Sequence, residues 1–290
     1  MLVSASTGGL DVRFGEMGAI KILKDAGLTA FDMSLCRAFE EGNDFYTEEN
    51  YMAHAKELRE YIDGIGLPCN QAHAPFWNSF DGDTNDLRFR QTVISMEVAA
   101  ILGAKAIVVH PIQHLRYADH AAELFDINVR FYNDLIPYAE KFGIKIATEN
   151  MYQRNTGSGV PSDSVCSRSW EFCKLIDAVN SPWLVGCLDI GHVSLMGADI
   201  PAFIRTMGNG RLCALHIHDT DLVNDNHTIP YLHKINFAPI LDALAEIGYK
   251  GDITFEANVI YRNFPDELCL SAARLMGDIG HYFADKVQGK

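Results

Sequence analysis

In residues 211–219, RLCALHIHD, apolar residues occupy every second position, and the run ends on polar residues that include two histidines. Such alternation is typical of a β-strand, whose side chains point in turn to opposite faces of a sheet. Cys213, Leu215 and Ile217 would then lie on an apolar face that meets the helices. The other face, which points inward, would carry Leu212, Ala214, His216 and His218. The run predicts a strand that presents a metal-ligand side chain at its C-terminal end.

Five other short runs end in the same way. They are CNQAH at His73, AIVVH at His110, KIATE at Glu149, VGCLD at Asp189 and DITFE at Glu256. With His216, the intervals between these ends are 37, 39, 40, 27 and 40 residues. A (β/α)₈ barrel of this length has about 36 residues for each strand and helix, and its strand ends meet at one mouth. The spacing therefore predicts a barrel with one cluster of these side chains.

The rest of the chain fits this architecture. Apolar periodicity of 3 and 4 residues over 120–142 predicts a helix, which we expect Pro137 to kink. No linker or low-complexity break divides the sequence, so we expect a single TIM-barrel domain over residues 1–290, with its site at the C-terminal ends of the strands. Strands are expected at 2–6, 28–34, 67–73, 105–110, 143–149, 184–189, 211–217 and 252–256.

The alternation places the candidate ligands inside the barrel. Ile144 and Ile146 would face the helices, which turns Glu149 inward. Ile253 and Phe255 do the same for Glu256. The polar strand ends therefore share the interior face.

The composition restricts the partners. A formal net charge of −14, without a cluster of Lys and Arg, argues against nucleic acid and anionic membranes. The N-terminus lacks the pattern of a signal peptide, and no apolar run is long enough to span a bilayer. The seven cysteines include no CxxC pair and are expected to be reduced thiols of a cytoplasmic protein. Apolar loops at the mouth would suit a homo-dimer or homo-tetramer.

Three loops at the mouth look long enough to serve as lids or substrate walls: 74–84, 150–168 and 219–234. The second lacks any periodicity. The first carries Phe76 and Trp77, which could stack on the apolar face of a ring in the substrate. Packing within the loop is the alternative for both aromatic residues.

Glu149, Asp189, His216 and Glu256 form the candidate metal site. Three carboxylates and one imidazole suit Mn²⁺, Mg²⁺ or Co²⁺ better than a structural Zn²⁺ site, which favours Cys and His. We therefore expect one divalent cation, with Mn²⁺ as the first choice and Zn²⁺ still possible.

The motifs HAPF, VVHP, TEN, CLDIGH, LHIHD, DNH..P and the final FE together resemble the sugar isomerase/epimerase superfamily, the xylose isomerase-like or endonuclease IV-like TIM barrels. The resemblance follows the whole chain in order. Within the superfamily, the site is similar to that of the ketose 3-epimerases, which use a Glu–Asp–His–Glu metal site. Carried over, these ligands are Glu149, Asp189, His216 and Glu256.

The same resemblance implies the chemistry. In such enzymes the two glutamates, here Glu149 and Glu256, move a proton, and the cation stabilises an ene-diolate next to the ketose carbonyl. The histidine of LDIGH, His192, would contact substrate oxygens. We expect His73, His110, His227 and Trp77 to contact the substrate as well.

Two positions depart from the epimerase pattern. Asn155 stands where the relatives carry an acidic residue, and Leu222 where they carry an arginine. The stretch TIPYLHKINF, after His227, also lacks their usual glycines. The substrate contacts are therefore expected to differ from those of the epimerases.

Three alternatives remain. An endonuclease IV-like AP endonuclease would use a multi-zinc site, and all nine of its ligand types have counterparts here. A lyase similar to inosose dehydratase would use the same metal and intermediate but expel water. A metal-free sugar-binding or regulatory barrel would not be an enzyme. The nine counterparts are His73, His110, Glu149, Asp189, His192, His216, Asp225, His227 and Glu256.

Overall fold

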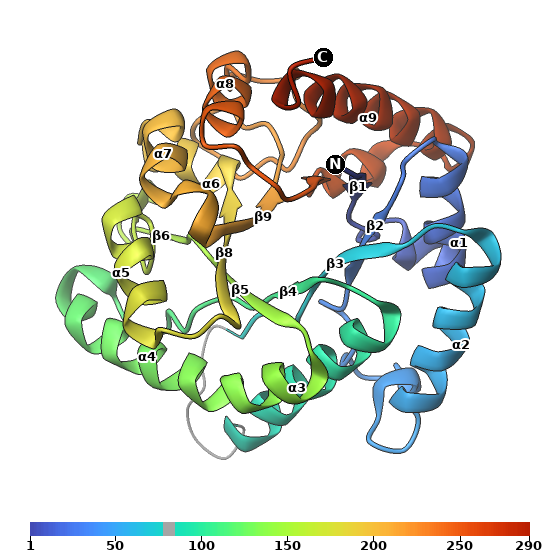
Figure 1. The fold of residues 1–290 in the computed structure, drawn as a ribbon, viewed down its shortest axis with the longest axis horizontal. Coiled ribbons are helices and arrows are strands. Elements are labelled where there is room, and N and C mark those ends of the chain that lie inside the picture. The colour runs from blue at the N-terminus through green and yellow to red at the C-terminus, as the bar shows by residue number, and fades with distance from the viewer. Residues whose placement is uncertain (78–84) are drawn as a thin grey trace.

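The computed structural model describes residues 1–77 and 85–290. Eight parallel strands form the centre of the molecule and confirm the predicted barrel, with ends that differ from the predicted ranges by a few residues (Figure 1). They are β1 (Val3–Ala5), β2 (Phe31–Ser34), β3 (Cys69–His73), β4 (Ala106–Val108), β5 (Lys145–Glu149), β8 (Leu184–Asp189), β9 (Leu212–His216) and β10 (Ile253–Phe255).

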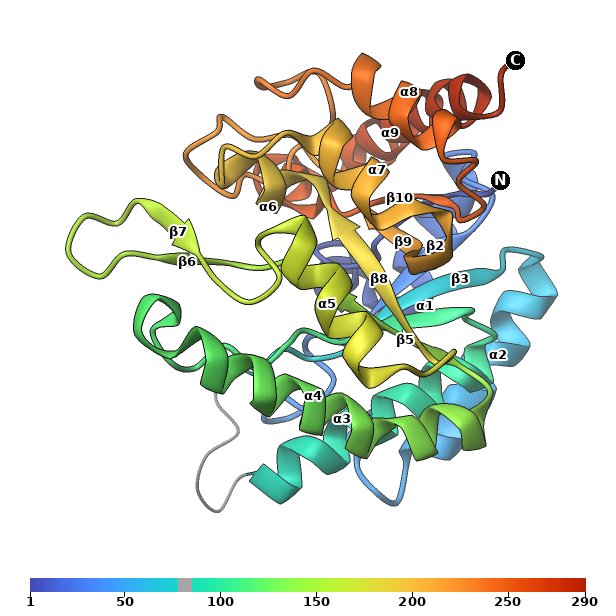
Figure 2. The ribbon, with the colours of Figure 1, turned by 60° about the vertical axis from the view of Figure 1, so that its left-hand side comes forward.

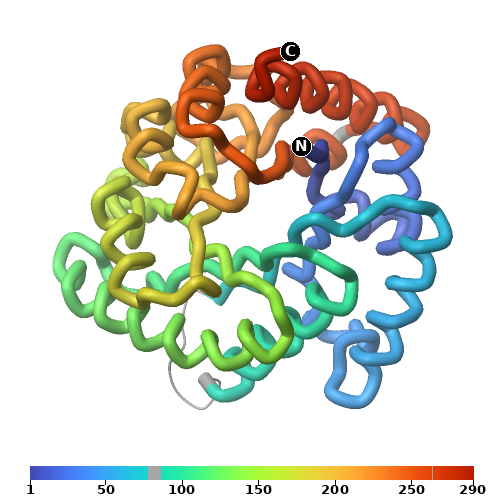
Figure 3. The backbone as a smooth tube through the Cα atoms, viewed as in Figure 1, coloured from blue at the N-terminus to red at the C-terminus, as the bar shows by residue number. Residues whose placement is uncertain are grey.

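Two single bridges close the ring. Six strands pair in the order β2-β3-β4-β5-β8-β9, and β1 pairs with β10. Ser6 bridges to Asp32 on β2, and Ile217, just after β9, bridges to Phe255 on β10. The N-terminal strand thus lies beside the C-terminal part of the chain, as the tube in Figure 3 shows.

Helices surround the strands on the outside of the ring (Figure 1). Several end at a glycine in the left-handed region, for example α4 at Gly143, before the chain turns into the next strand. The outer helices are α1 (Asp11–Asp25), α2 (Tyr51–Ile65), α3 (Asn85–Leu102), α4 (Tyr117–Phe142), α5 (Ser169–Val179), α7 (Ile200–Arg211), α8 (Ala238–Glu246) and α9 (Asp266–Val287). Shorter helices are α6 (Ile190–Leu195), η1 (Asp44–Tyr46) and η3 (Asn258–Asn263).

The strands separate two apolar layers. Larger side chains such as Ile146, Leu215 and Phe255 belong to the main core between strands and helices. A second cluster, of smaller side chains from four strands, fills the barrel interior beneath the polar strand ends. Its members are Ala106, Val108, Ala147, Val185, Cys187 and Ala214. This division confirms the predicted alternation for Glu149 and Glu256.

The alternation is wrong at the start of β9. Leu212 belongs to the main core and Cys213 packs against the interior cluster, the reverse of the prediction. The cause is a shift in the pairing of β8 with β9, between Gly186 and Cys187. Such an irregularity moves side chains to the other face.

The loop at 150–168 is not without structure. It forms an antiparallel hairpin of β6 (Tyr152–Arg154) and β7 (Pro161–Asp163), which projects from the barrel in Figure 2. Strands of three residues are too short to show a periodicity, so the sequence could not reveal them. Residues 78–84 of the loop at 74–84 lie outside the described residues.

Helix α4 continues through Pro137, and its departure from helical geometry lies at His120 instead. The first turn has its own anchors, because the Tyr117 N–H and hydroxyl donate to Gln153 and Glu171 respectively. These contacts tie the turn to strand β6 of the hairpin and to helix α5. All seven cysteines are free thiols, and no described helix is long and apolar enough to cross a membrane.

Gly280 on α9 packs closely against β1 and β10, the two strands at the ends of the barrel sequence. A Cβ at this position would overlap Val3 of β1 and Phe255 of β10, whereas a Cβ at Gly64 on α2 would meet nothing. We expect Gly280→Ala to lower the free energy of unfolding by about 1–3 kcal/mol. Gly64→Ala, the matched control, should raise it by roughly 0.5–1 kcal/mol. Equal denaturation midpoints for the two variants would contradict the close contact.

Candidate metal centre and active site

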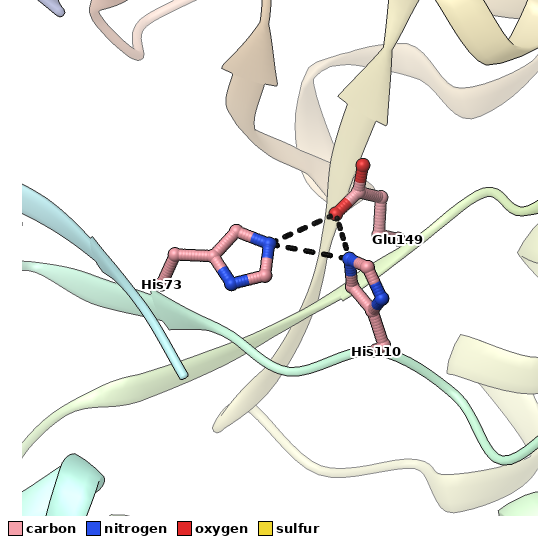
Figure 4. A group of neighbouring side chains, drawn as sticks. All are labelled: His73, His110 and Glu149. Atoms are coloured by element: carbon pink, nitrogen blue, oxygen red, sulfur yellow. Dashed lines mark hydrogen bonds and ion pairs between the residues drawn. The ribbon is translucent and has the colours of Figure 1, made fainter. Parts of the chain in front are cut away.

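All six predicted strand-end residues meet at the mouth of the barrel. His73 from β3, His110 after β4 and Glu149 from β5 point toward one another in Figure 4. The two Nε2 atoms lie 3.2 Å apart, and Glu149 Oε2 lies 3.0 Å from His110 Nε2 and 3.7 Å from His73 Nε2. The first three strand ends therefore form one contact group.

The four predicted metal ligands also lie together. Glu149, Asp189, His216 and Glu256 each offer one ligand atom, and these atoms all lie within 4.8 Å of one another. His216 Nδ1 is 3.2 Å from Glu149 Oε1 and 3.4 Å from Glu256 Oε2. We call these four residues the metal cluster.

Burial and neighbouring charges have opposite effects on the pKa values of the carboxylates in this cluster. Burial raises the pKa of Glu149, but the charges of His216 and His110 outweigh it and hold that pKa well below its usual value. Burial likewise raises the pKa of Asp189, and His192 and His218 reverse the shift. Both carboxylates are therefore ionised, as metal ligands must be.

The donor set fits a hard divalent cation. Three carboxylates and one imidazole converge on a space of a few ångströms, and the cluster contains no thiolate. Cys187 lies next to Glu149 and His216, but burial raises its pKa to about 12, so it stays a neutral thiol. The residues present thus suit a divalent cation bound through carboxylate oxygens and one imidazole nitrogen, and the cluster differs from a thiolate-rich zinc site.

A further group lies on the other side of the metal cluster. Asp225 Oδ2 is 3.1 Å from His227 Nε2 and 3.4 Å from His192 Nε2. The Nδ1 of His192 bonds to the carbonyl of Asn150, and the Nδ1 of His227 to the carbonyl of Glu256. Both rings therefore turn Nε2 toward Asp225.

His218 contacts both the metal cluster, through Asp189, and the further group, through His227. Its Nε2 lies 3.1 Å from both oxygens of Asp189, and its ring stacks on His227 with centroids 4.1 Å apart. A Cβ at Gly191 would overlap the His218 ring, so only glycine leaves room for it there. The histidine thus links Asp189 to the loop that carries His227.

A cavity of about 510 Å³ lies above these groups. Of the four residues in the metal cluster, only Glu149 and Glu256 are among its described lining residues, and Asp189 and His216 are covered by other side chains. The lining consists of Cys36, His73, Phe76, His110, Gln113, Glu149, Met151, Tyr152, Arg154, His192, Asp225, His227 and Glu256. The two glutamates therefore face both the metal position and the cavity.

One predicted substrate contact lies elsewhere, and several lining residues were missed. Trp77 is not among the described residues that line the cavity; the Arg88 guanidinium lies over its ring. Phe76 lines it instead and stacks on His110, with ring centroids 5.3 Å apart. Tyr152, whose hydroxyl donates to Asp225, and Cys36 carried no signal in the sequence because they lie on a very short strand and in a loop.

Comparisons with known proteins agree with the barrel fold. The sequence family described as xylose isomerase-like TIM barrel matches residues 20–276. An uncharacterized protein of Methanocaldococcus jannaschii, MJ1311, is 32% identical over 262 residues, which are 85% of this chain and 84% of that one. Fructoselysine 3-epimerase of Escherichia coli is 26% identical over 133 residues, 46% of each chain. A crystal structure of a D-tagatose 3-epimerase-like protein superposes with a TM-score of 0.77 at 22% identity and covers 100% of this chain and 99% of that chain.

The metal cluster leads to a first prediction about ligands. We expect Mn²⁺ at about 100 times its Kd to stabilise the protein by roughly 2.7 kcal/mol, a rise in Tm of about 4 °C. Asp189→Asn should abolish the rise, because it removes one charged ligand. Asp221→Asn, on an exposed turn of the next loop, should keep it. An Asp189→Asn protein that responds like the wild type in thermal unfolding would rule out this cluster as the binding site.

Proposed function

Because the chain belongs to the xylose isomerase-like TIM barrel family, we propose that it is a divalent-metal-dependent isomerase or epimerase of a small sugar or polyol ketone. The observation that carries the proposal is that Glu149 and Glu256 belong to the metal cluster and also line the cavity. A carboxylate in this position can reach a substrate held at the metal. The similarity to fructoselysine 3-epimerase supports the same class of reaction.

The chemistry follows from these positions. A bound Mn²⁺ would polarise the carbonyl and adjacent hydroxyl of the substrate and stabilise the charge of an ene-diolate. Glu149 and Glu256 would remove and return the proton of the neighbouring carbon. Transfer between opposite faces of one carbon gives epimerisation, and transfer between adjacent carbons gives aldose–ketose isomerisation.

The remaining polar groups would bind the sugar. His192 and His227 line the cavity on one side of the glutamates, and His73 and His110 line it beside Glu149. Imidazole nitrogens at these places can hydrogen-bond to substrate hydroxyls. Phe76 lines the same cavity and could stack on the sugar. The seven free thiols support a reducing, cytoplasmic setting.

Deuterium exchange tests the proposal directly. Incubation with a panel of ketoses and aldoses and Mn²⁺ in D₂O should place deuterium on a carbon next to the carbonyl. Glu149→Gln and Glu256→Gln should each slow this exchange by about 10²–10⁴, since each removes a proton-transfer group.

Glu246→Gln is the matched control, because Glu246 pairs with Arg205 at the surface of α8. It should exchange at the wild-type rate. Wild-type rates in both site variants would refute the proton-transfer roles, and exchange with loss of water would indicate the lyase. If no sugar exchanges and abasic DNA is cut, the proposed function is wrong.

One observation favours a second candidate, an endonuclease IV-like enzyme with several zinc ions. The nine counterpart residues fall into three groups of neighbouring ligand atoms: His73–His110–Glu149, the metal cluster, and His192–Asp225–His227. Glu149 belongs to the first two groups. Against a role on DNA stands the net charge of −14.

Metal stoichiometry separates the two candidates. For the isomerase we expect titration calorimetry to find one tightly bound Mn²⁺ per chain, which His110→Gln and His192→Gln retain. Three tightly bound Zn²⁺ per chain, reduced by one in each variant, together with cleavage of abasic DNA, would favour the endonuclease.

A further inference from the structure

Three unpartnered polar atoms lie inside the barrel, at the edge of the metal cluster. They are both carboxylate oxygens of Asp32 on β2 and Nε2 of His216 on β9, which accept or donate no hydrogen bond among the described residues. Both residues are fully buried. A buried carboxylate without a partner is costly, so its presence needs a physical reason.

Two of the three atoms lie close to each other. Asp32 Oδ2 lies 3.9 Å from His216 Nε2, and Asp32 belongs to none of the groups of converging ligand atoms. The distance is somewhat longer than a hydrogen bond and too short to admit a bridging water. A shift of about 1 Å by either side chain would complete the bond.

The surroundings of His216 fix its ring in one orientation. Its Nδ1 edge faces Glu149 and Glu256, at 3.2 and 3.4 Å. His73 stacks on its face, with ring centroids 5.3 Å apart and planes 12° apart. The Nε2 edge is thus left to Asp32.

We propose that Asp32 is a positioning residue that accepts the Nε2–H of His216 and so keeps Nδ1 free of a proton and directed at the bound cation. This inference rests on the proposed function, because it requires the metal. A histidine that ligates a metal commonly donates its other N–H to a carboxylate, which fixes the tautomer and strengthens the ligand. Asp32 is not among the described residues that line the cavity, so it acts through His216 alone.

Cys187 is the competing partner. It forms a group with Glu149 and His216, and its thiol is neutral because burial raises its pKa to about 12. A neutral thiol is a weak acceptor, whereas a carboxylate forms a charge-assisted bond. The comparison of the two residues therefore supplies the control for the experiment.

The test compares metal affinity with the stability of the metal-free protein. Asp32→Asn should raise the Kd for Mn²⁺ by about 10–100-fold in titration calorimetry. It should leave the Tm of the EDTA-treated protein unchanged or raise it, because it removes a buried carboxylate that has no hydrogen-bond partner there. Cys187→Ala should keep the Kd of the wild type. A purely structural role for Asp32 would instead lower the Tm of the metal-free protein and leave the Kd unchanged.

The wild-type protein provides a check that needs no variant. In a long-range ¹H–¹⁵N spectrum of the Zn²⁺-loaded protein, His216 should carry its proton on Nε2. A proton on Nδ1, an unchanged Kd in Asp32→Asn, or a loss of affinity in Cys187→Ala alone would each overturn the inference. Wild-type protein that binds no divalent cation would refute the metal site itself, whereas wild-type binding retained by Asp32→Asn refutes only the role of Asp32.

Discussion

The repulsion between carboxylates that lie close together at the barrel mouth is the constraint on which the rest of the site depends. Glu149, Asp189 and Glu256 place carboxylate oxygens within 4.8 Å of one another, and two of these residues are almost fully buried. Repulsion at this distance is strong where water is excluded. The histidines packed around the carboxylates offset it, and a cation would offset it further. The cluster can persist only because a rigid ring of paired strands holds each member in place.

The barrel and its metal cluster were predictable from the sequence because both depend on a regular property of strands. Alternation fixed the inward face of Glu149 and Glu256, and the intervals of a strand–helix unit implied the ring. The exception at Leu212 and Cys213 arose from a local shift in pairing, which no alternation reveals. Asp32 was missed for another reason. It alternates with Phe31 and Met33, which belong to the main core, but it lies within a strand and not at its end.

The substrate wall was much less predictable. It comes from loops and from a hairpin of two strands with three residues each, whose positions depend on long-range contacts. Phe76 and Trp77 are neighbours in one loop, and of the two only Phe76 is among the described residues that line the cavity. Neither composition nor periodicity distinguishes two adjacent aromatic residues. Their positions follow from what packs against each ring, His110 in one case and Arg88 in the other.

The difference between strand ends and loops explains why the fold restricts the possible chemistry more than it restricts the possible substrates. The residues that would move protons come from strand ends, which the barrel holds in register, whereas the wall above them comes from segments that can change independently. Arg154 links two of these segments, because its guanidinium donates to the carbonyls of Gly159 in the hairpin and Val223 in the next loop. Asn155 and Leu222, the positions that depart from the epimerase pattern, are the chain neighbours of these contact residues. We therefore expect changes at the hairpin and at its contact with Val223 to alter the wall of the cavity and to leave Glu149 and Glu256 in place.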